Sequence, residues 1–152
     1  MNFNHKICET DITKITVLDQ PKADISVATW PCTKYSEVAD IHRTRTGDDL
    51  FLHHFRHVAL ERPEMYIIEN VPGMRKFPVV MEAMTKLPDY YVRVECPVNA
   101  KEWLPQERKR LIVFGTKRPG FINMKMVHIQ LIAKRKTVKA FIMFMFRRMG
   151  KY

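Results

Sequence analysis

Three short polar clusters in this 152-residue sequence contain side chains that can carry out covalent chemistry. The first contains Cys32 after a β-rich run, and the second contains Glu69 directly after an apolar run. The third is basic, contains Arg108 and Arg110, and leads into another apolar run. A thiol, a carboxylate and two guanidinium groups suit nucleophilic catalysis with acid assistance, provided that the fold brings them to one place.

The elements around these clusters predict an α/β fold. Strands are expected over residues 7–12, 24–29, 65–68, 90–94 and 111–114, and helices over 48–61 and 78–87. The first helix is expected to bury a stripe of Leu52, Phe55, Val58 and Ala59, and the second a stripe of Val79, Val80, Ala83, Met84 and Leu87. Strands that alternate with helices predict a parallel sheet, and ligands then bind beyond the carboxyl ends of its strands. The loops after Thr29 and Ile68 are therefore the predicted site.

The three clusters also resemble the signature motifs of a known family. Pro31-Cys32, Glu69-Asn70-Val71 and Gln106-x-Arg108-x-Arg110 have the order and spacing found in the DNA (cytosine-5) methyltransferases, and the resemblance covers about residues 5–118. It implies a partial Rossmann-like, S-adenosylmethionine-dependent methyltransferase sheet with flanking helices. Residues 1–118 would form a partial catalytic domain, and residues 119–152 a basic, Met-rich tail that periodicity leaves open between strand and helix.

The resemblance also implies a role for each residue of the clusters. Cys32 would add to carbon 6 of cytosine, which makes carbon 5 reactive toward the methyl group. Glu69 would hydrogen-bond the ring nitrogen and the exocyclic amine of the base, and Arg110 would bind its carbonyl oxygen. Arg108 would support the site through contacts to phosphate or to the catalytic loop. The base must be flipped out of the DNA duplex to reach such a pocket.

S-adenosylmethionine is the cofactor that the resemblance implies, with Asp11, Ile12 and Pro31 as its contacts. The family's Phe-x-Gly-x-Gly cofactor loop is not found, because no G-x-G occurs in the sequence. We therefore expect impaired cofactor binding and an open sheet edge where the first strand of the family would lie. A second polypeptide that carries the missing motifs would complete this truncated or split methyltransferase, of the kind found in restriction–modification systems.

Charge is unevenly distributed along the chain. Residues 119–152 hold eight Lys and Arg and no Asp or Glu, so residues 1–118 hold the other 18 basic and all 16 acidic side chains. A basic surface favours nucleic acid through counterion release and steering. Two functions therefore stay open, the methyltransferase and a non-enzymatic nucleic-acid-binding remnant that uses the basic tail. RNA cytosine as the methylated substrate also stays open.

Other features argue against several classes of protein. No apolar run is long enough to cross a bilayer and no signal peptide is evident, so an intracellular location (cytoplasm or nucleoid) is expected. Three cysteines are too few for a disulfide framework, and we expect Cys8 and Cys96 to pack in the core. His53 and His57 have metal-ligand spacing on a helix, but no third ligand is evident. An exposed helix face is the expectation there, and no metal site.

Overall fold

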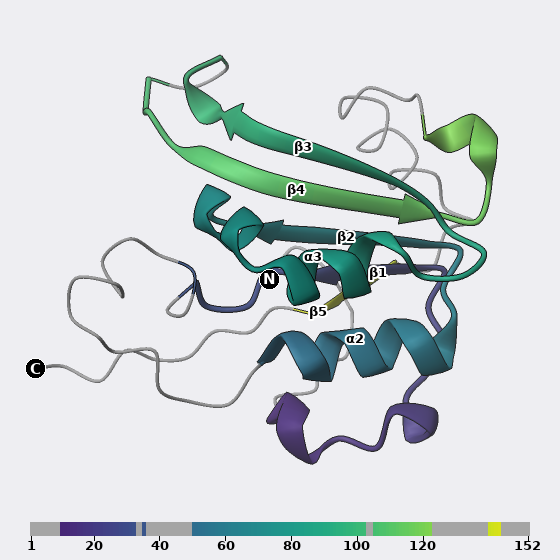
Figure 1. Cartoon of the computed structure of the whole chain (residues 1–152). Helices are drawn as coiled ribbons and strands as arrows, with labels where there is room; N and C mark the ends of the chain where they lie inside the picture. Colours follow the sequence, from purple (N-terminus) through teal and green to yellow (C-terminus); the bar gives the residue numbers. More distant parts are fainter. Residues whose placement is uncertain (1–9, 33–34, 36–49, 103–104, 123–139, 144–152) are drawn as a thin grey trace, which may run out of the picture.

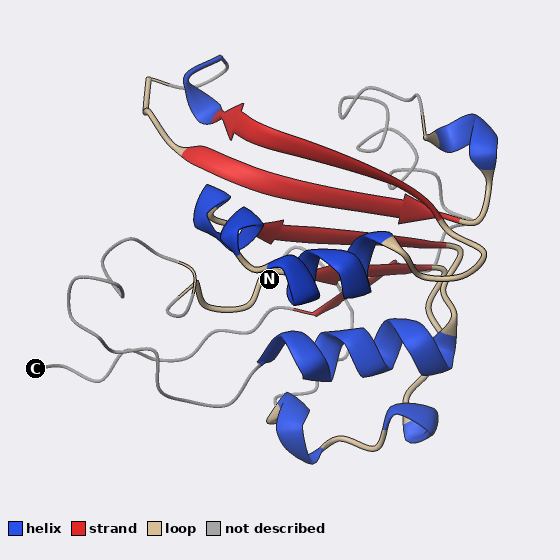
Figure 2. Cartoon of the chain, viewed as in Figure 1, coloured by secondary structure: helices blue, strands red, loops and turns tan. Residues whose placement is uncertain are grey.

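The computed structural model describes residues 10–32, 35, 50–102, 105–122 and 140–143. Five strands within these ranges form one sheet in the order β3-β4-β2-β1-β5 (Figures 1 and 2). The strands are β1 (Ile25–Ala28), β2 (Met65–Asn70), β3 (Tyr91–Asn99), β4 (Lys109–Thr116) and β5 (Ala140–Met143). The α-helices are α2 (Leu50–Glu61) and α3 (Pro78–Thr85). Short 3-10 helices are η1 (Ile12–Lys14), η2 (Val17–Asp19), η3 (Pro72–Lys76), η4 (Ala100–Glu102) and η5 (Pro119–Phe121).

The sheet is mixed, which corrects the expectation of a parallel one. β1 pairs in parallel with β2 through the crossover helix α2, as the sequence pattern predicts. β4 runs antiparallel to both of its neighbours, β2 and β3 (Figure 1). The reason is the connection: β3 and β4 are joined by η4 and a short loop, and a parallel neighbour would need a longer crossover.

The edge beside β1 is not open, contrary to the expectation. β5 pairs with β1 in parallel from Ile25↔Ala140 to Ala28↔Met143. Part of the Met-rich C-terminal segment therefore lies in the same sheet as the three motif-bearing strands. The predicted strand residues 7–9, the run 127–132 and residues 144–146 lie outside the described residues.

Helices α2 and α3 cover one face of the sheet (Figure 2). The predicted stripe on α2 is correct for Val58, which is buried, and for Phe55, which packs against the core. It is wrong for Leu52, which is 57% exposed, and it missed the buried Phe51 and His54. On α3 the stripe is correct except for Val79, which is 74% exposed. None of the helices in the described ranges is long and apolar enough to span a membrane.

The core beneath the helices depends on a large residue placed opposite a small one. Tyr66 on β2 is fully buried and pairs across the ladder with Gly115 on β4. A Cβ atom at Gly115 would lie only 2.1 Å from Cε1 of the Tyr66 ring. The Tyr66 hydroxyl donates a hydrogen bond to the carbonyl of Met84, which ties α3 to β2. Burial raises the pKa of Tyr66 well above its usual range.

A histidine occupies the same core between α2 and the sheet. His54 is fully buried, and its Nε2 lies 3.2 Å from Oγ of Ser26 on β1. Burial, with a smaller contribution from the charge of His57, lowers the pKa of His54 to about 3. His54 is therefore neutral in the folded protein throughout the physiological range.

Gly115→Ala is expected to destabilise the protein by about 2–3 kcal/mol, because the new methyl group overlaps the buried Tyr66 ring. Gly120→Ala is the matched control, since no atom lies within 4 Å of a Cβ at that position, and a change within about 0.5 kcal/mol is expected. Urea unfolding followed by far-UV circular dichroism measures both variants. Equal stabilities of the two variants would contradict this packing.

Stability is also expected to fall as the pH drops below 6.5, the ordinary pKa of histidine that His54 regains on unfolding. The unfolded chain then binds a proton that the folded chain excludes, so this group costs up to about 1.4 kcal/mol per pH unit between 6.5 and 3. Urea unfolding at several pH values should show a shallower dependence for His54→Gln. His53→Gln is the control and should retain the wild-type slope; the same slope in both variants would refute the assignment.

Candidate active site

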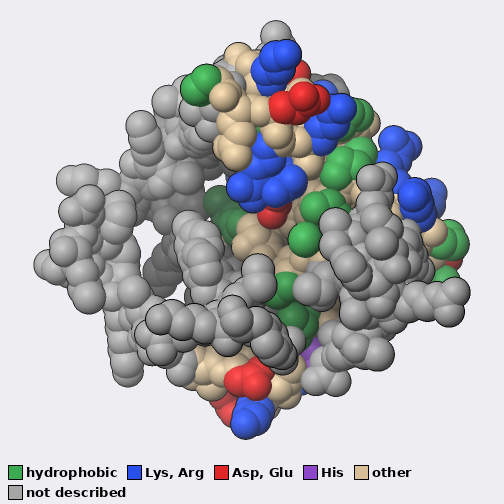
Figure 3. Space-filling view, turned by 90° about the vertical axis from the view of Figure 1, so that its left-hand side faces the viewer, with side chains coloured by type: hydrophobic (Ala, Val, Ile, Leu, Met, Phe, Trp, Pro, Cys, Tyr) green, Lys and Arg blue, Asp and Glu red, His purple; other side chains and the backbone are tan. Residues whose placement is uncertain are grey.

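The three motif-bearing segments meet at one edge of the sheet. β1 and β2 are parallel neighbours, so the loops that follow Ala28 and Asn70 leave the sheet on the same side. β4 is antiparallel to β2, so its start near Lys109 lies at this edge as well. Figure 3 looks onto this edge, at the left of Figure 1. The topology thereby brings the three predicted clusters together.

Asn70, the last residue of β2, ties the two loops to each other. Its side chain is 2% exposed, and its Nδ2 donates a hydrogen bond of 3.4 Å to the carbonyl of Trp30. Its Oδ1 accepts one of 2.8 Å from the backbone N–H of Val71. The amide therefore fixes the segment just before Cys32 against the end of the strand that carries Glu69. The sequence placed Asn70 in a motif but gave no indication of this positioning role.

Two buried aromatic residues hold the turn that contains Cys32. Trp30 packs its ring against those of His54 and Phe51 on α2, at centroid distances of 5.7 and 6.2 Å. Tyr35 is also buried and makes an edge-to-face contact of 4.9 Å with Phe77. The backbone N–H of Tyr35 donates to the carbonyl of Cys32 at 2.9 Å, which closes a turn. Cys32 is half-buried between these anchors.

Gly73 allows the second loop to approach this turn. A Cβ atom at Gly73 would lie 2.0 Å from the backbone oxygen of Tyr35. Any larger residue must therefore push the loop after β2 away from the loop after β1, because the obstacle is backbone and cannot rotate away. The glycine of Val71-Pro72-Gly73 is thus required by close approach of two chain segments.

Glu69 and Arg110 form an ion pair at the same edge, with Nε of Arg110 2.6 Å from Oε1 of Glu69. The two side chains are 30% and 26% exposed, so both are accessible from solvent. Arg108 lies apart from this pair. It is exposed in the loop between β3 and β4, where its backbone N–H donates to Oδ1 of Asn99 at 3.2 Å. Of the three charged residues that the sequence predicts for the site, the structure thus brings Glu69 and Arg110 into contact.

The predicted cofactor residues lie in two places. Pro31 directly precedes Cys32 and is half-buried. Asp11 does not directly end a strand within the described residues but is the N-cap of η1, where its Oδ1 accepts hydrogen bonds from the backbone N–H and the hydroxyl of Thr13. These bonds lower the pKa of Asp11. Ile12 is buried beside it, so the exposed, ionised carboxylate stands on a segment that is anchored in the core.

The histidines of α2 do not form the exposed face that the sequence predicts. His57 is 2% exposed, and its Nδ1 lies 3.2 Å from Glu61. Within the described ranges, no three His, Cys, Asp or Glu side chains converge on a metal position. Cys96 packs against the core, as expected, and Cys8 lies outside the described residues.

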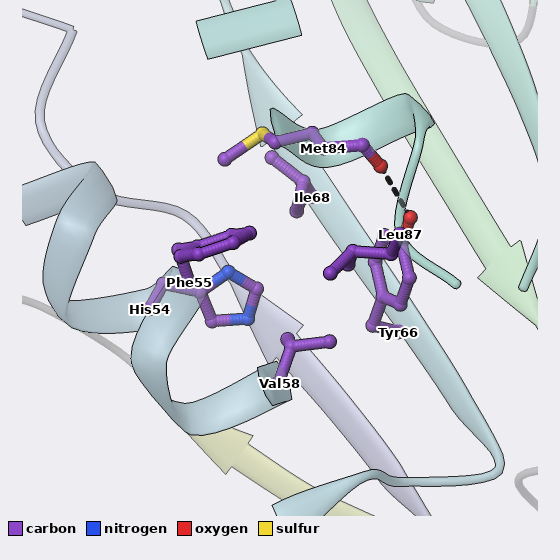
Figure 4. Close-up of a pocket in the computed structure, with 7 residues that line it drawn as sticks. All are labelled: His54, Phe55, Val58, Tyr66, Ile68, Met84 and Leu87. Carbon is purple, nitrogen blue, oxygen red and sulfur yellow. Dashed lines mark hydrogen bonds between the residues drawn. The ribbon is translucent and has the colours of Figure 1, made fainter. Parts of the chain in front are cut away.

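A small cavity between α2, α3 and β2 does not belong to the site. Figure 4 shows that its walls are largely apolar, and it leaves no room for a water molecule. Its lining residues are His54, Phe55, Val58, Tyr66, Ile68, Met84 and Leu87. These residues pack as part of the core.

Basic side chains border the edge that carries Cys32 and Glu69. Figure 3 shows Lys and Arg side chains gathered on this face, with a few acidic ones among them. The exposed basic residues on η3, on η4 and at the start of β4 are Arg75, Lys76, Lys101, Arg108 and Lys109. Such a border attracts polyanions.

The family model for C-5 cytosine-specific DNA methylases matches residues 1–143. The chain is 30% identical over 125 residues to the type II methyltransferase M.Bsp6I of Bacillus sp. (strain RFL6), covering 75% of this chain and 39% of the relative. It is 32% identical over 130 residues to the type II methyltransferase M.NgoBV of Neisseria gonorrhoeae, covering 76% and 30%. The chain thus spans between 30% and 39% of the length of these relatives.

Solved structures show the same fold. The Entamoeba histolytica methyltransferase EhMeth superposes with a TM-score of 0.61 at 19% identity, over 78% of this chain and 40% of its own. The S. pombe Dnmt2 methyltransferase gives 0.53 at 15% identity, over 86% and 40%. Because the family model covers nearly the whole chain, the protein belongs to the C-5 cytosine-specific DNA methylase family.

Proposed function

We propose that this chain carries the nucleophile of an enzyme that methylates carbon 5 of cytosine in DNA through a covalent cysteine adduct. The observation that supports the proposal most strongly is the shared edge. Asn70 and Gly73 hold the Cys32 turn against the end of the strand that presents Glu69, and Glu69 is itself paired with Arg110. A nucleophile, a carboxyl group and a cation then act on one flipped-out base.

In the proposed reaction, the thiolate of Cys32 forms a bond to carbon 6 of the cytosine. The electrons of the 5–6 double bond move toward carbon 5, while Glu69 hydrogen-bonds the ring nitrogen and the exocyclic amine. Arg110 donates a hydrogen bond to the carbonyl oxygen and stabilises the charge that develops on the ring. Carbon 5 then takes the methyl group, which S-adenosylmethionine would supply with its thioether as the leaving group. The proton of carbon 5 passes to a base from solvent, and the bond to Cys32 breaks as the double bond re-forms.

S-adenosylmethionine would supply the methyl group. Asp11, Ile12 and Pro31 suit such a ligand, because the exposed carboxylate of Asp11 can accept a hydrogen bond from the adenine amine. Ile12 is buried, so it would support the site by anchoring the segment that carries Asp11. Both hydrogen bonds from Thr13 fall on Oδ1 of Asp11, and Oδ2 makes none within the described part of the chain.

The proposed partners are DNA and a second polypeptide. The basic border of the edge would bind phosphates that flank the flipped base, and Arg108 would contribute there. The second polypeptide would carry a glycine-rich cofactor loop, since no G-x-G occurs in the sequence.

Covalent trapping tests the proposal. Release of the enzyme requires carbon 5 to lose a proton. In a DNA duplex that contains 5-fluorocytosine, a fluorine replaces that hydrogen and cannot leave, so the covalent adduct persists. With S-adenosylmethionine, and with a fragment of a relative that supplies the missing motifs, we expect an adduct that survives denaturing electrophoresis. Cys32→Ser should abolish it, whereas Cys96→Ser, which changes a thiol packed against the core, should retain it.

The result that overturns the proposal is the absence of any adduct, with and without the complementing fragment, from a chain that circular dichroism shows to be folded. Salt-sensitive DNA binding that persists in such a chain would instead favour the hypothesis of a non-enzymatic nucleic-acid-binding remnant. A trapped species with RNA but not with DNA would move the substrate to RNA.

A further inference from the structure

One arginine of α2 holds both ends of the 3-10 helix that follows Asp11. Nη2 of Arg56 donates hydrogen bonds to the carbonyl of Ile12, at 2.8 Å, and to that of Ile15, at 2.6 Å. Ile12 is the first residue of η1 and Ile15 is its C-cap, so a single nitrogen spans the element. These bonds cross more than 40 residues of sequence.

This contact is a costly way to stabilise the fold. Arg56 is half-buried, and its Nε is buried without a hydrogen-bond partner. No carboxylate in the described part of the chain lies within ion-pair distance of its guanidinium. An apolar side chain would avoid the desolvation of a cation, so packing alone does not explain an arginine here. A role in fixing the position of η1 does explain it.

The position of η1 decides where Asp11 lies. Asp11 is the N-cap of this helix, and its carboxylate is oriented by Thr13 within the same turn. Ile12 is anchored in the core beneath it. Because Arg56 fixes both carbonyl ends of η1, it also sets the direction in which the exposed carboxylate of Asp11 points.

We propose that Arg56 is a positioning residue for the cofactor, which holds η1 so that Asp11, on a segment anchored by the buried Ile12, presents its carboxylate to the adenine amine. The inference rests on the proposed function for the identity of the ligand, and on the two carbonyl contacts for the mechanism. The same helix packs Phe51 and His54 against Trp30 beside Cys32. One rigid element therefore supports both the cofactor segment and the nucleophile turn.

Limited proteolysis tests the positioning in the free chain. Lys14 is exposed at the end of η1, and Lys22 is exposed outside it. Loss of two charge-assisted hydrogen bonds in Arg56→Met should speed tryptic cleavage after Lys14 at least about tenfold relative to cleavage after Lys22. Arg56→Lys should restore protection in part, since an ammonium group can still donate to both carbonyls. Arg62→Met removes a guanidinium that pairs with Asp89 instead, and should leave the ratio unchanged.

Calorimetric titration with S-adenosylhomocysteine, with the complementing fragment present, tests the role in binding. Arg56→Met should raise the Kd at least about tenfold while circular dichroism shows a folded chain, and Arg56→Lys should recover part of the affinity. Unchanged cleavage after Lys14 would overturn the positioning role. Faster cleavage with an unchanged Kd would overturn the link to the cofactor. A wild-type protein that binds no S-adenosylhomocysteine, by contrast, would count against the proposed function itself.

Discussion

The parallel pairing of β1 with β2 is the constraint on which the candidate site depends. It places the ends of two strands side by side, and the buried amide of Asn70 then joins the loops that leave them. The side chain of Asn70 is 2% exposed, and a buried amide destabilises the fold unless its polar atoms are hydrogen-bonded. The hydrogen bond from Asn70 therefore fixes the carbonyl of Trp30 relative to the core. The turn with Cys32 is thereby oriented by the sheet rather than by its own loop.

Helix α2 supports this arrangement from below. It connects β1 to β2, buries Phe51 and His54 against Trp30, and reaches η1 through Arg56. Its His54 and His57 are buried, where an ordinary amphipathic helix would have apolar residues. Several nitrogens along this helix are buried without a partner among the described residues, which costs stability that an apolar helix would keep.

Sequence periodicity predicts the parts of the fold that rest on local pattern. The apolar runs that became β1, β2 and β4 follow directly from β-branched residues bounded by polar loops. Only part of the buried face of α2 could be predicted, because hydrophobicity places Leu52 inside and His54 outside. The hydrogen-bond partner of the buried His54 is Ser26 on β1, 28 residues away in sequence. The pairing of β5 with β1 is likewise non-local, and nothing in its composition indicates that strand as its neighbour.

For the site, the motifs identify Cys32, Glu69 and Arg110 as neighbours, because strand ends at one edge of a sheet must converge. They did not predict that Arg108 lies apart from the Glu69–Arg110 pair, since the turn between β3 and β4 is set by Asn99. The roles of Asn70, Gly73 and Arg56 depend on contacts between segments that only the folded chain brings together.

The measurement that tests the central claim most directly is the rate of adduct formation at Cys32 in Asn70→Ala, with the adducted peptide mapped by mass spectrometry. Thr85→Ala is the control, because it removes a side-chain hydrogen bond within α3, away from the edge. If Asn70 holds the nucleophile turn, Asn70→Ala should remain folded and form the adduct at least about tenfold more slowly than Thr85→Ala. Equal rates in the two folded variants would show that the turn is positioned by something other than the end of β2.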